Sequence, residues 1–310
     1  MFTTTNPITI HSAAGASSLG SRPTQQDQYT VLLPEDFNKS SDKIAFFAVY
    51  DGHGSEKISK HASENIQRLL QESPALEAGN LEDAIKDAIR TEEKLLLDEF
   101  RNGEEEFAIA GSTASLALVN LTKGVLVAGN LGDSHILLAE YEGDEGEPEN
   151  IRRITHSHKP EDPEEKDRIQ EAGGTVNMAS GTPRVGALNM SRALGDLQYK
   201  DPLVSTLTGS APDEQDKSDG AFDENHKSLV SSEPYLNRVD LADGYRRVLI
   251  LTTDGVTNTM KDDPVVKGVL ASFQAGMSAT DCAKVVVQEA AKTPGSDNST
   301  CIVVFLGSSS

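Results

Sequence analysis

The chain has 310 residues, of which 37% are hydrophobic, and its 28 basic and 49 acidic residues give a formal net charge of −21. A chain of this length can bury a substantial core, and we expect one domain spanning residues 1–310. So acidic a protein is a poor partner for nucleic acid or an anionic membrane, because both bind through basic surfaces. The sequence also lacks a run of about 18 apolar residues of the kind that spans a bilayer.

Apolar runs of strand length recur along the chain and are separated by polar turns. They lie at residues 44–50, 113–119, 124–128, 135–139, 248–253 and 301–306. The second to fourth runs are typical of an antiparallel meander. Residues 55–70 and 81–100 place apolar side chains at a helical period, and Ser278 begins a third helix that continues through residues 282–292. This order predicts an α+β layered domain.

Two acidic stretches interrupt this pattern, at residues 140–150 and 201–232. Both are rich in polar residues and contain few apolar side chains that would fix them to a core. We expect both to be mobile insertions.

Three aspartates stand beside strand-like runs. Asp51-Gly52 and Asp254-Gly255 each end such a run, and Asp297-Asn298 stands just before another. Most Asp-Gly pairs in such places are tight turns that bind nothing. Carboxylates at strand ends are, however, also what a sheet needs to gather oxygen ligands around Mg²⁺ or Mn²⁺. The remaining motifs favour the second interpretation, one metal site.

Four further motifs accompany these aspartates, and they lie at residues 21–27 (SRPTQQD), 111–114 (GSTA), 130–134 (NLGDS) and 191–196 (SRALGD). In order and spacing, the whole set resembles the metal-dependent Ser/Thr protein phosphatases of type 2C, also called the PPM family, over residues 14–306. The resemblance implies a four-layer α-β-β-α sandwich, in which two packed antiparallel β-sheets are flanked by α-helices on both outer faces. It also implies a flap and an acidic insertion near residues 197–232.

The resemblance further implies two Mg²⁺ or Mn²⁺ ions. Asp51 would bridge them, the Gly52 carbonyl would bind one ion, and Asp254 and Asp297 would hold the other, while Asp27 acts through bound water. Two ions about 3.5–4 Å apart can share a water and lower its pKa, which gives a hydroxide for in-line attack on phosphorus. Glycine suits position 52, because a backbone oxygen approaches a metal most easily where no side chain crowds it.

Arg22 and His53 are the expected catalytic residues. The family places its phosphate-binding arginine at Arg22, whose guanidinium fork matches two phosphoryl oxygens. His53 follows the Asp-Gly pair, near the leaving-group oxygen, and an ordinary histidine pKa of about 6.5 suits a general acid. Without the resemblance, Arg22 would pass for a surface arginine and His53 for a structural histidine.

Four positions depart from the family's usual pattern, namely Gln26, His135, Ser157 and Asn258. Asn258 matters most, because the family often has an aspartate there that binds a third metal together with the equivalent of Asp133. Whether a third ion binds is therefore left open. Asp133 is either its ligand or a turn residue with nothing bound.

We accordingly expect a Mg²⁺- or Mn²⁺-dependent phosphatase that hydrolyses phosphoserine and phosphothreonine monoesters of proteins. The alternative is a catalytically weak family member that acts as a phosphoprotein-binding regulator, but the retained carboxylates, Arg22 and His53 argue against it. A metal-dependent phosphodiesterase or nuclease would need a basic strip. We expect an intracellular monomer, located in the cytoplasm, nucleus or mitochondrial matrix and not secreted, with phosphorylated proteins as partners and neither nucleic acid nor membrane.

Overall fold

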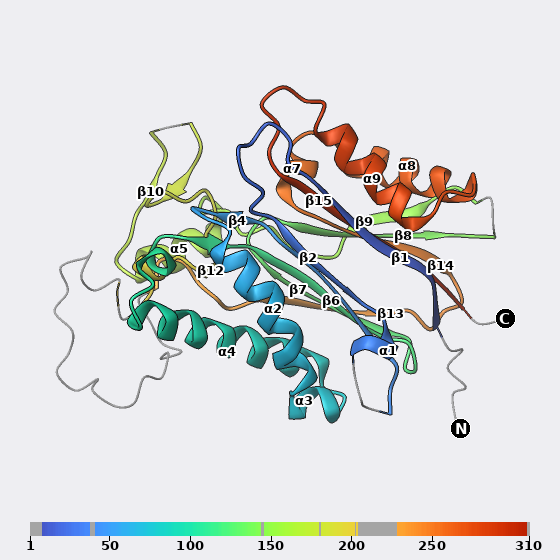
Figure 1. The fold of residues 1–310 in the computed structure, drawn as a ribbon, viewed down its shortest axis with the longest axis horizontal. Coiled ribbons are helices and arrows are strands. Elements are labelled where there is room, and N and C mark those ends of the chain that lie inside the picture. The colour runs from blue at the N-terminus through green and yellow to red at the C-terminus, as the bar shows by residue number, and fades with distance from the viewer. Residues whose placement is uncertain are drawn as a thin grey trace.

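The computed structural model describes residues 8–37, 41–143, 146–179, 181–201, 203 and 228–308. Within these residues, two antiparallel sheets of five strands each lie face to face (Figure 1). The first sheet has the order β1 (Ile8–Ser18), β15 (Ser299–Ser308), β14 (Arg246–Thr252), β8 (His135–Tyr141) and β9 (Glu149–Arg153). The second has the order β13 (Tyr235–Asp240), β7 (Val125–Leu131), β6 (Ala114–Asn120), β3 (Ile44–Tyr50) and β2 (Gln28–Leu32).

Helices cover the outer face of each sheet. The first sheet is covered by α8 (Asp262–Gln274) and α9 (Ala279–Ala290), and the second by α2 (Lys57–Gln71) and α4 (Leu81–Arg101), as Figure 1 shows. The predicted α+β fold, a four-layer α-β-β-α sandwich, is therefore confirmed. The shorter helices are α1 (Pro34–Phe37), α3 (Pro74–Glu77), η1 (Glu105–Ala108), α5 (Pro163–Glu171), η2 (Leu197–Tyr199) and α7 (Asp254–Thr257). No helix in the described part of the chain is long and apolar enough to cross a membrane.

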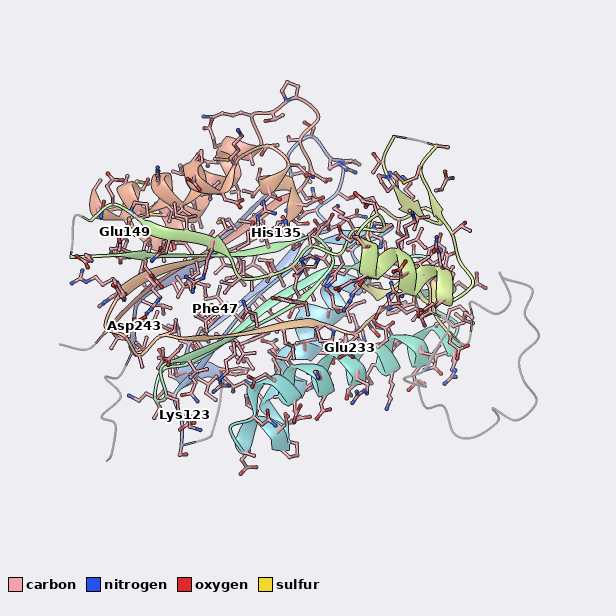
Figure 2. The ribbon with its side chains drawn as sticks, turned by 180° about the vertical axis from the view of Figure 1, so that it is seen from behind. Phe47, Lys123, His135, Glu149, Glu233 and Asp243 are labelled. Carbon is pink, nitrogen blue, oxygen red and sulfur yellow. The ribbon has the colours of Figure 1, made fainter. Side chains whose placement is uncertain are left out.

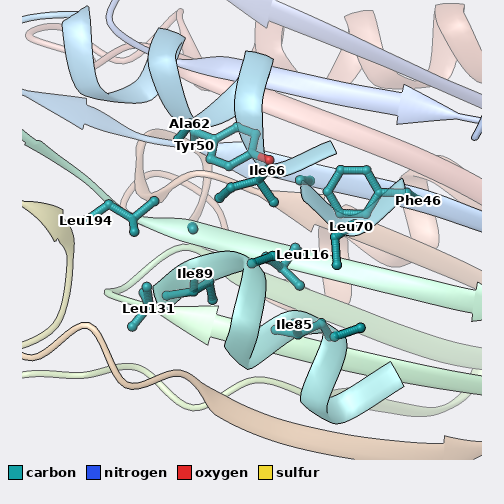
Figure 3. Packing of buried hydrophobic residues seen from close by; sticks show 14 of the residues in the cluster. Phe46, Tyr50, Ala62, Ile66, Leu70, Ile85, Ile89, Leu116, Leu131 and Leu194 are labelled. Carbon is teal, nitrogen blue, oxygen red and sulfur yellow. The ribbon is translucent and has the colours of Figure 1, made fainter. Parts of the chain in front are cut away.

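Strand β3 shows why the layers form. All seven of its residues are buried, because helices cover one face of its sheet and the other sheet covers the opposite face. Successive side chains of a strand point to opposite faces. Phe46 and Tyr50 accordingly pack with α2 and α4 (Figure 3), whereas Phe47 lies in the core between the two sheets (Figure 2). On the far side, Phe305 of β15 stacks on Phe273 of α8 with ring centroids 3.6 Å apart.

Most predicted elements are present, with small shifts at their ends. The strand predicted at residues 44–50 is β3 with the same bounds, and the helix predicted from residue 55 begins at Lys57. The loop predicted at residues 140–150 is shorter than expected, because β8 continues to Tyr141 and β9 begins at Glu149, with Glu140 pairing with Glu149 after a register shift. Most of the acidic segment 201–232 lies outside the described residues, so its predicted mobility stays a prediction.

A third, smaller sheet joins distant parts of the chain at one end of the sandwich. Its order is β12 (Leu194–Gly195), β5 (Gly111–Ser112) and β4 (Gly52–His53), with Gly111 facing both Gly195 and His53. Beyond it lie α5 and the hairpin of β10 (Val176–Asn177) and β11 (Arg184–Val185) (Figure 1).

A buried ion pair fixes β12 to α4. The Lys200 ammonium donates to Glu93 Oε1 at 2.6 Å and to the Ala193 carbonyl at 2.8 Å, and the Gly195 amide donates to Glu93 Oε2 at 3.3 Å. Both charged side chains are almost completely buried. Burial raises the pKa of Glu93 even though the Lys200 ammonium opposes that change. The pair therefore holds one arrangement of β12 at a cost in desolvation.

We predict that Glu93→Ala lowers the free energy of unfolding by about 3–5 kcal/mol, because it leaves the Lys200 ammonium buried without its counter-ion. Replacing both partners, as Glu93→Leu with Lys200→Met, should restore most of that loss. Urea denaturation followed by circular dichroism measures both changes. The exposed pair of Glu289 and Lys292 is the matched control, and Glu289→Ala should cost less than about 1 kcal/mol. Equal costs for Glu93→Ala and Glu289→Ala would contradict the prediction.

Candidate active site

Five aspartates lie at the same end of the sandwich. Because neighbouring strands are antiparallel, the ends of β3, β7 and β14 meet the starts of β2, β8 and β15 at this edge. The five aspartates stand beside these ends: Asp27 before β2, Asp51 after β3, Asp133 between β7 and β8, Asp254 as the first residue of α7 after β14, and Asp297 before β15. The fold therefore brings together the three aspartates that the sequence singled out and the two expected beside them.

The carboxylates repel one another in a buried setting. Burial raises the pKa of Asp51 well above its usual range, and the charges of Asp27 and Asp254 push it further. Burial likewise raises the pKa of Asp254 to about 6, with Asp133 acting in the same direction. The pKa of Asp27 rises to about 7 for the same first reason, although hydroxyl groups that donate to it oppose the change. Without added positive charge, this cluster resists full ionisation near neutral pH.

Glycine follows two of these aspartates because another motif packs against it. A Cβ on Gly52 would lie 2.5 Å from the Gln26 carbonyl oxygen, and one on Gly255 would lie 1.9 Å from the Asn298 carbonyl oxygen. Both distances are far below van der Waals contact. The Asp-Gly pairs are therefore more than turn signals, since each glycine lets a second segment of the site approach its aspartate.

Asn298 ties the segment before β2 to the segment before β15. Its Oδ1 accepts from the Gln26 amide at 2.8 Å, and its Nδ2 donates to the Leu19 carbonyl at 2.9 Å. The neighbouring Arg22 Nη2 lies 2.6 Å from Asp297 Oδ2. The backbone amide of Asn298 donates to Asp297 Oδ1 at 2.7 Å. Arg22 thus reaches the site, where its side chain is 54% exposed and pairs with a predicted metal ligand.

The carboxylate oxygens suit hard divalent cations, although those of the described residues do not converge on one point in this structure. Among the described residues, no three acidic, histidine or cysteine side chains surround a common point closely enough to hold a metal. The oxygens of Asp297 and Asp254 are instead engaged by Arg22 and Asn258. Asp27 Oδ1 is buried and has no hydrogen-bond partner in the described structure, while its Oδ2 accepts from Thr253 and Thr300 at 2.9 and 2.8 Å. Crowded carboxylates and an unpartnered buried oxygen are what a Mg²⁺ or Mn²⁺ ion would stabilise.

The surroundings of Asp133 differ from those of the other acids. Its Oδ2 forms an ion pair with the Lys159 ammonium, and its Oδ1 is buried without a hydrogen-bond partner among the described residues. Across from it, Asn258 Nδ2 donates to Asp254 Oδ2 at 3.0 Å. Lys159 also lowers the pKa of Asp254 against the stronger effects of burial and Asp133. Lys159 is therefore paired with Asp133, the expected ligand of a third ion, and Asn258 is bonded to Asp254.

His135, a second departure from the family pattern, stands where an arginine is common, and it contacts Arg153. His135 Nε2 lies 2.7 Å from Arg153 Nη1, and Arg153 also makes two bonds to the Asp262 carboxylate at 2.6 and 2.9 Å. Burial and the Arg153 charge lower the pKa of His135 to about 4, so that its ring is neutral and can accept from Arg153. A guanidinium from β9 thus lies beside His135.

His53 lies at the edge of the carboxylate cluster and pairs with Asp196. His53 Nε2 is 2.7 Å from Asp196 Oδ2, and the Asp196 side chain is fully buried. Burial alone would lower the pKa of His53, but the Asp196 carboxylate, with help from the Asp133 charge, more than offsets this, and the pKa is raised overall. The 191–196 motif was identified in the sequence without any role for Asp196. The Gly-Asp ending of that motif was the only available signal, and it does not indicate a partner.

Comparison with known proteins agrees with this arrangement. The family model described as "Protein phosphatase 2C" matches residues 17–299. Protein phosphatase 2C homolog 2 of Saccharomyces cerevisiae is 36% identical over 208 residues, which cover 63% of this chain and 41% of the yeast protein. The human integrin-linked kinase-associated serine/threonine phosphatase 2C is 28% identical over 320 residues, which cover 94% of this chain and 71% of the human protein. The chain belongs to the protein phosphatase 2C family.

Solved structures support the fold. A serine-threonine phosphatase 2C from Toxoplasma gondii superposes with a TM-score of 0.74 at 23% identity, covering 97% of this chain and 99% of that one. A Caenorhabditis elegans sex determining protein gives a TM-score of 0.73 at 22% identity, with 96% and 64% covered. Among curated relatives, the chain spans 41% of the budding yeast homolog 2 and 64% of protein phosphatase 2C homolog 3 of Schizosaccharomyces pombe.

We predict that Asn258→Asp adds a weak Mn²⁺-binding event, roughly millimolar, because two carboxylates hold a dication far better than one carboxylate and an amide. Asp133→Ala in the unmodified chain should change Mn²⁺ binding little, since Lys159 already neutralises that carboxylate. Isothermal titration calorimetry counts the binding events.

Asn258→Ala is the matched control, because it also removes the amide bonded to Asp254 but adds no charge. A titration of Asn258→Asp that matches Asn258→Ala would rule out a latent third site. Loss of a binding event in Asp133→Ala would show that a third ion already binds the unmodified chain.

Proposed function

We propose that this chain is a metal-dependent protein phosphatase that hydrolyses phosphoserine and phosphothreonine monoesters. The observation that carries the proposal is the cluster of buried and half-buried aspartates at one end of the sandwich, beside Arg22 and His53. The family and the printed names of its relatives support the same activity. A phosphate dianion near this cluster requires added positive charge, because the acids alone would repel it.

Five residues would hold two Mg²⁺ or Mn²⁺ ions. They are Asp51, the Gly52 carbonyl, Asp254, Asp297 and, through water, Asp27. When bound, the ions would lower the pKa of a shared water and so supply a hydroxide nucleophile. Release of Arg22 from Asp297 would free its guanidinium to bind two phosphoryl oxygens. His53 would give a proton to the departing serine or threonine oxygen, which is a poor leaving group as an alkoxide.

The site also bears on the rival functions. A phosphoprotein-binding regulator without turnover would not need the metal carboxylates, the arginine and the histidine in one place. A nuclease would need basic side chains along a track for the nucleic acid backbone, whereas the chain has a formal charge of −21. We propose phosphorylated proteins as the substrates of an intracellular monomer, in the cytoplasm, nucleus or mitochondrial matrix.

We predict that Asp254→Asn and Asp297→Asn each weaken Mn²⁺ binding and reduce turnover by orders of magnitude, because an amide cannot supply the anionic oxygen that a dication needs. The metal-free Asp254→Asn protein should be at least as stable as the original at pH 7. In the unmodified protein the pKa of the Asp254 carboxyl is raised to about 6. Ionising this carboxyl at pH 7 therefore costs folding free energy, and the amide of the variant does not incur that cost. Calorimetry and metal-free thermal melts measure these effects.

Glu64→Gln, on the exposed side of α2, is the matched control for charge removal. It should leave Mn²⁺ binding and turnover unchanged. If both aspartate variants bind Mn²⁺ with the original affinity and stoichiometry, the two-ion assignment is wrong.

We predict that His53→Gln lowers kcat mainly for substrates with poor leaving groups. General acid catalysis is worth roughly 10²–10⁴-fold when an alkoxide departs and much less for a stabilised phenolate. The loss should therefore be large on a phosphothreonine peptide and small on p-nitrophenyl phosphate. Equal losses on both substrates would mean that His53 positions the site and does not donate a proton.

A further inference from the structure

The strongest unexplained contact at the site is the one between His53 and Asp196, which are 143 residues apart in the sequence. Asp196 Oδ2 lies 2.7 Å from His53 Nε2, a distance typical of a charge-assisted hydrogen bond. The carboxylate is buried, whereas 23% of the histidine side chain is exposed. Solvent therefore reaches part of the His53 side chain but not the Asp196 side chain.

The backbone around this pair is built to bring the two side chains together. Asp196 adopts φ 49° and ψ 37°, a left-handed conformation that is uncommon for a residue other than glycine. Its amide donates to the Ala110 carbonyl at 2.8 Å, which fixes this conformation. Strained residues of this kind persist only where surrounding contacts hold them, and they cluster at functional sites.

Gly111 packs directly against the pair of His53 and Asp196. It pairs with His53 in β4 and with Gly195, the residue before Asp196, in β12. The small sheet therefore fixes the positions of both His53 and Asp196. A Cβ at Gly111 would lie 2.1 Å from Asp196 Oδ2 and 2.5 Å from His53 Nε2. The pair therefore occupies the space that any larger residue at this position would need.

The contact leaves the two ring nitrogens of His53 with different surroundings. Nε2 is engaged by Asp196, whereas Nδ1 is buried and has no hydrogen-bond partner in the described part of the chain. A carboxylate that accepts a hydrogen bond from Nε2–H fixes the tautomer and the orientation of the ring. Nδ1 is then the ring nitrogen without a partner among the described residues, and it can exchange a proton only with a substrate atom that reaches it.

We propose that Asp196 is the positioning residue of His53, holding its imidazole with Nε2 protonated and Nδ1 available to the leaving group. This inference rests on the proposed phosphatase function. As the phosphorus–oxygen bond of the substrate breaks, the imidazolium form of His53 gives its Nδ1 proton to the departing oxygen. The Nε2 proton stays on the ring, hydrogen-bonded to Asp196, which remains ionised. The Asp196 carboxylate acts through the histidine and does not touch substrate.

The first test is kinetic and uses Asp196→Asn, because asparagine keeps the size of the side chain and tolerates the left-handed conformation. We expect kcat on a phosphothreonine peptide to fall by roughly 10²-fold, KM to change less than about twofold, and activity on p-nitrophenyl phosphate to fall much less. Combining Asp196→Asn with His53→Gln should add no further loss, since both act through one proton transfer. Equal losses on the two substrates, or additive losses in the double variant, would overturn the proposal.

The second test does not depend on turnover. Nitrogen-15 NMR of the unmodified protein, at a pH where the His53 ring is neutral, should show the proton on Nε2. Observation of the Nδ1-protonated tautomer would overturn the inference whether or not the protein is active. If the tautomer is as expected but Mn²⁺ gives no activity on either substrate, the proposed function fails while the placement of His53 by Asp196 stands. Gly111→Ala, checked for folding by circular dichroism, should disturb the same tautomer, because its Cβ would fall on both Asp196 Oδ2 and His53 Nε2; an unchanged tautomer in this variant would count against the proposal.

Discussion

The structure depends on one electrostatic constraint, which is that several buried or half-buried carboxylates are held close together. Burial and mutual repulsion raise the pKa values of Asp27, Asp51 and Asp254 together. A protein can hold such a cluster only if the surrounding framework is stiff and positive charge lies within reach. The two sheets, each covered on its outer face, supply the stiffness. Arg22 and Lys159 supply charge from the chain itself at two edges of the cluster.

The strands and the metal-type aspartates could be predicted from the sequence because their signals are local. An apolar run such as residues 44–50 must be buried on both faces, and an aspartate that ends it must lie at the edge of a sheet. Strand β1 and helix α8 were not predicted. β1 is rich in serine, threonine and alanine and is only partly buried, and α8 has acidic residues in its first turn but no side-chain cap. β1 therefore gives no clear periodic signal, whereas α8 does space its buried Val265, Val266, Val269 and Leu270 at a helical period and could have been predicted from the sequence.

The partners of the site residues could not be predicted, since each partner comes from a distant segment. Lys159 reaches Asp133, Asp196 reaches His53 and Asn298 bonds the Gln26 backbone only after the strands have paired. Sequence spacing contains no information on which of many charged residues will be adjacent in three dimensions. The glycines are intermediate, because Gly52 and Gly255 were visible as turn residues, but the backbone that packs on each of them was not.

The pairing of β1 with β15 has a consequence for how the protein acquires its site. Ile8 pairs with Ser308 and Ser18 with Ser299, so this part of the first sheet joins segments about as far apart as the described chain allows. Contacts of such long range form slowly, because the entropy of closing a large loop must be lost before they contribute stability. Asp297 and Asn298 stand directly before β15 and contact Arg22 and Gln26 beyond the other end of the pairing. The carboxylate cluster is therefore complete only once Asp297 and Asn298 have been synthesised and β15 has paired with β1, and a chain that stops before them lacks the geometry to gather its charges.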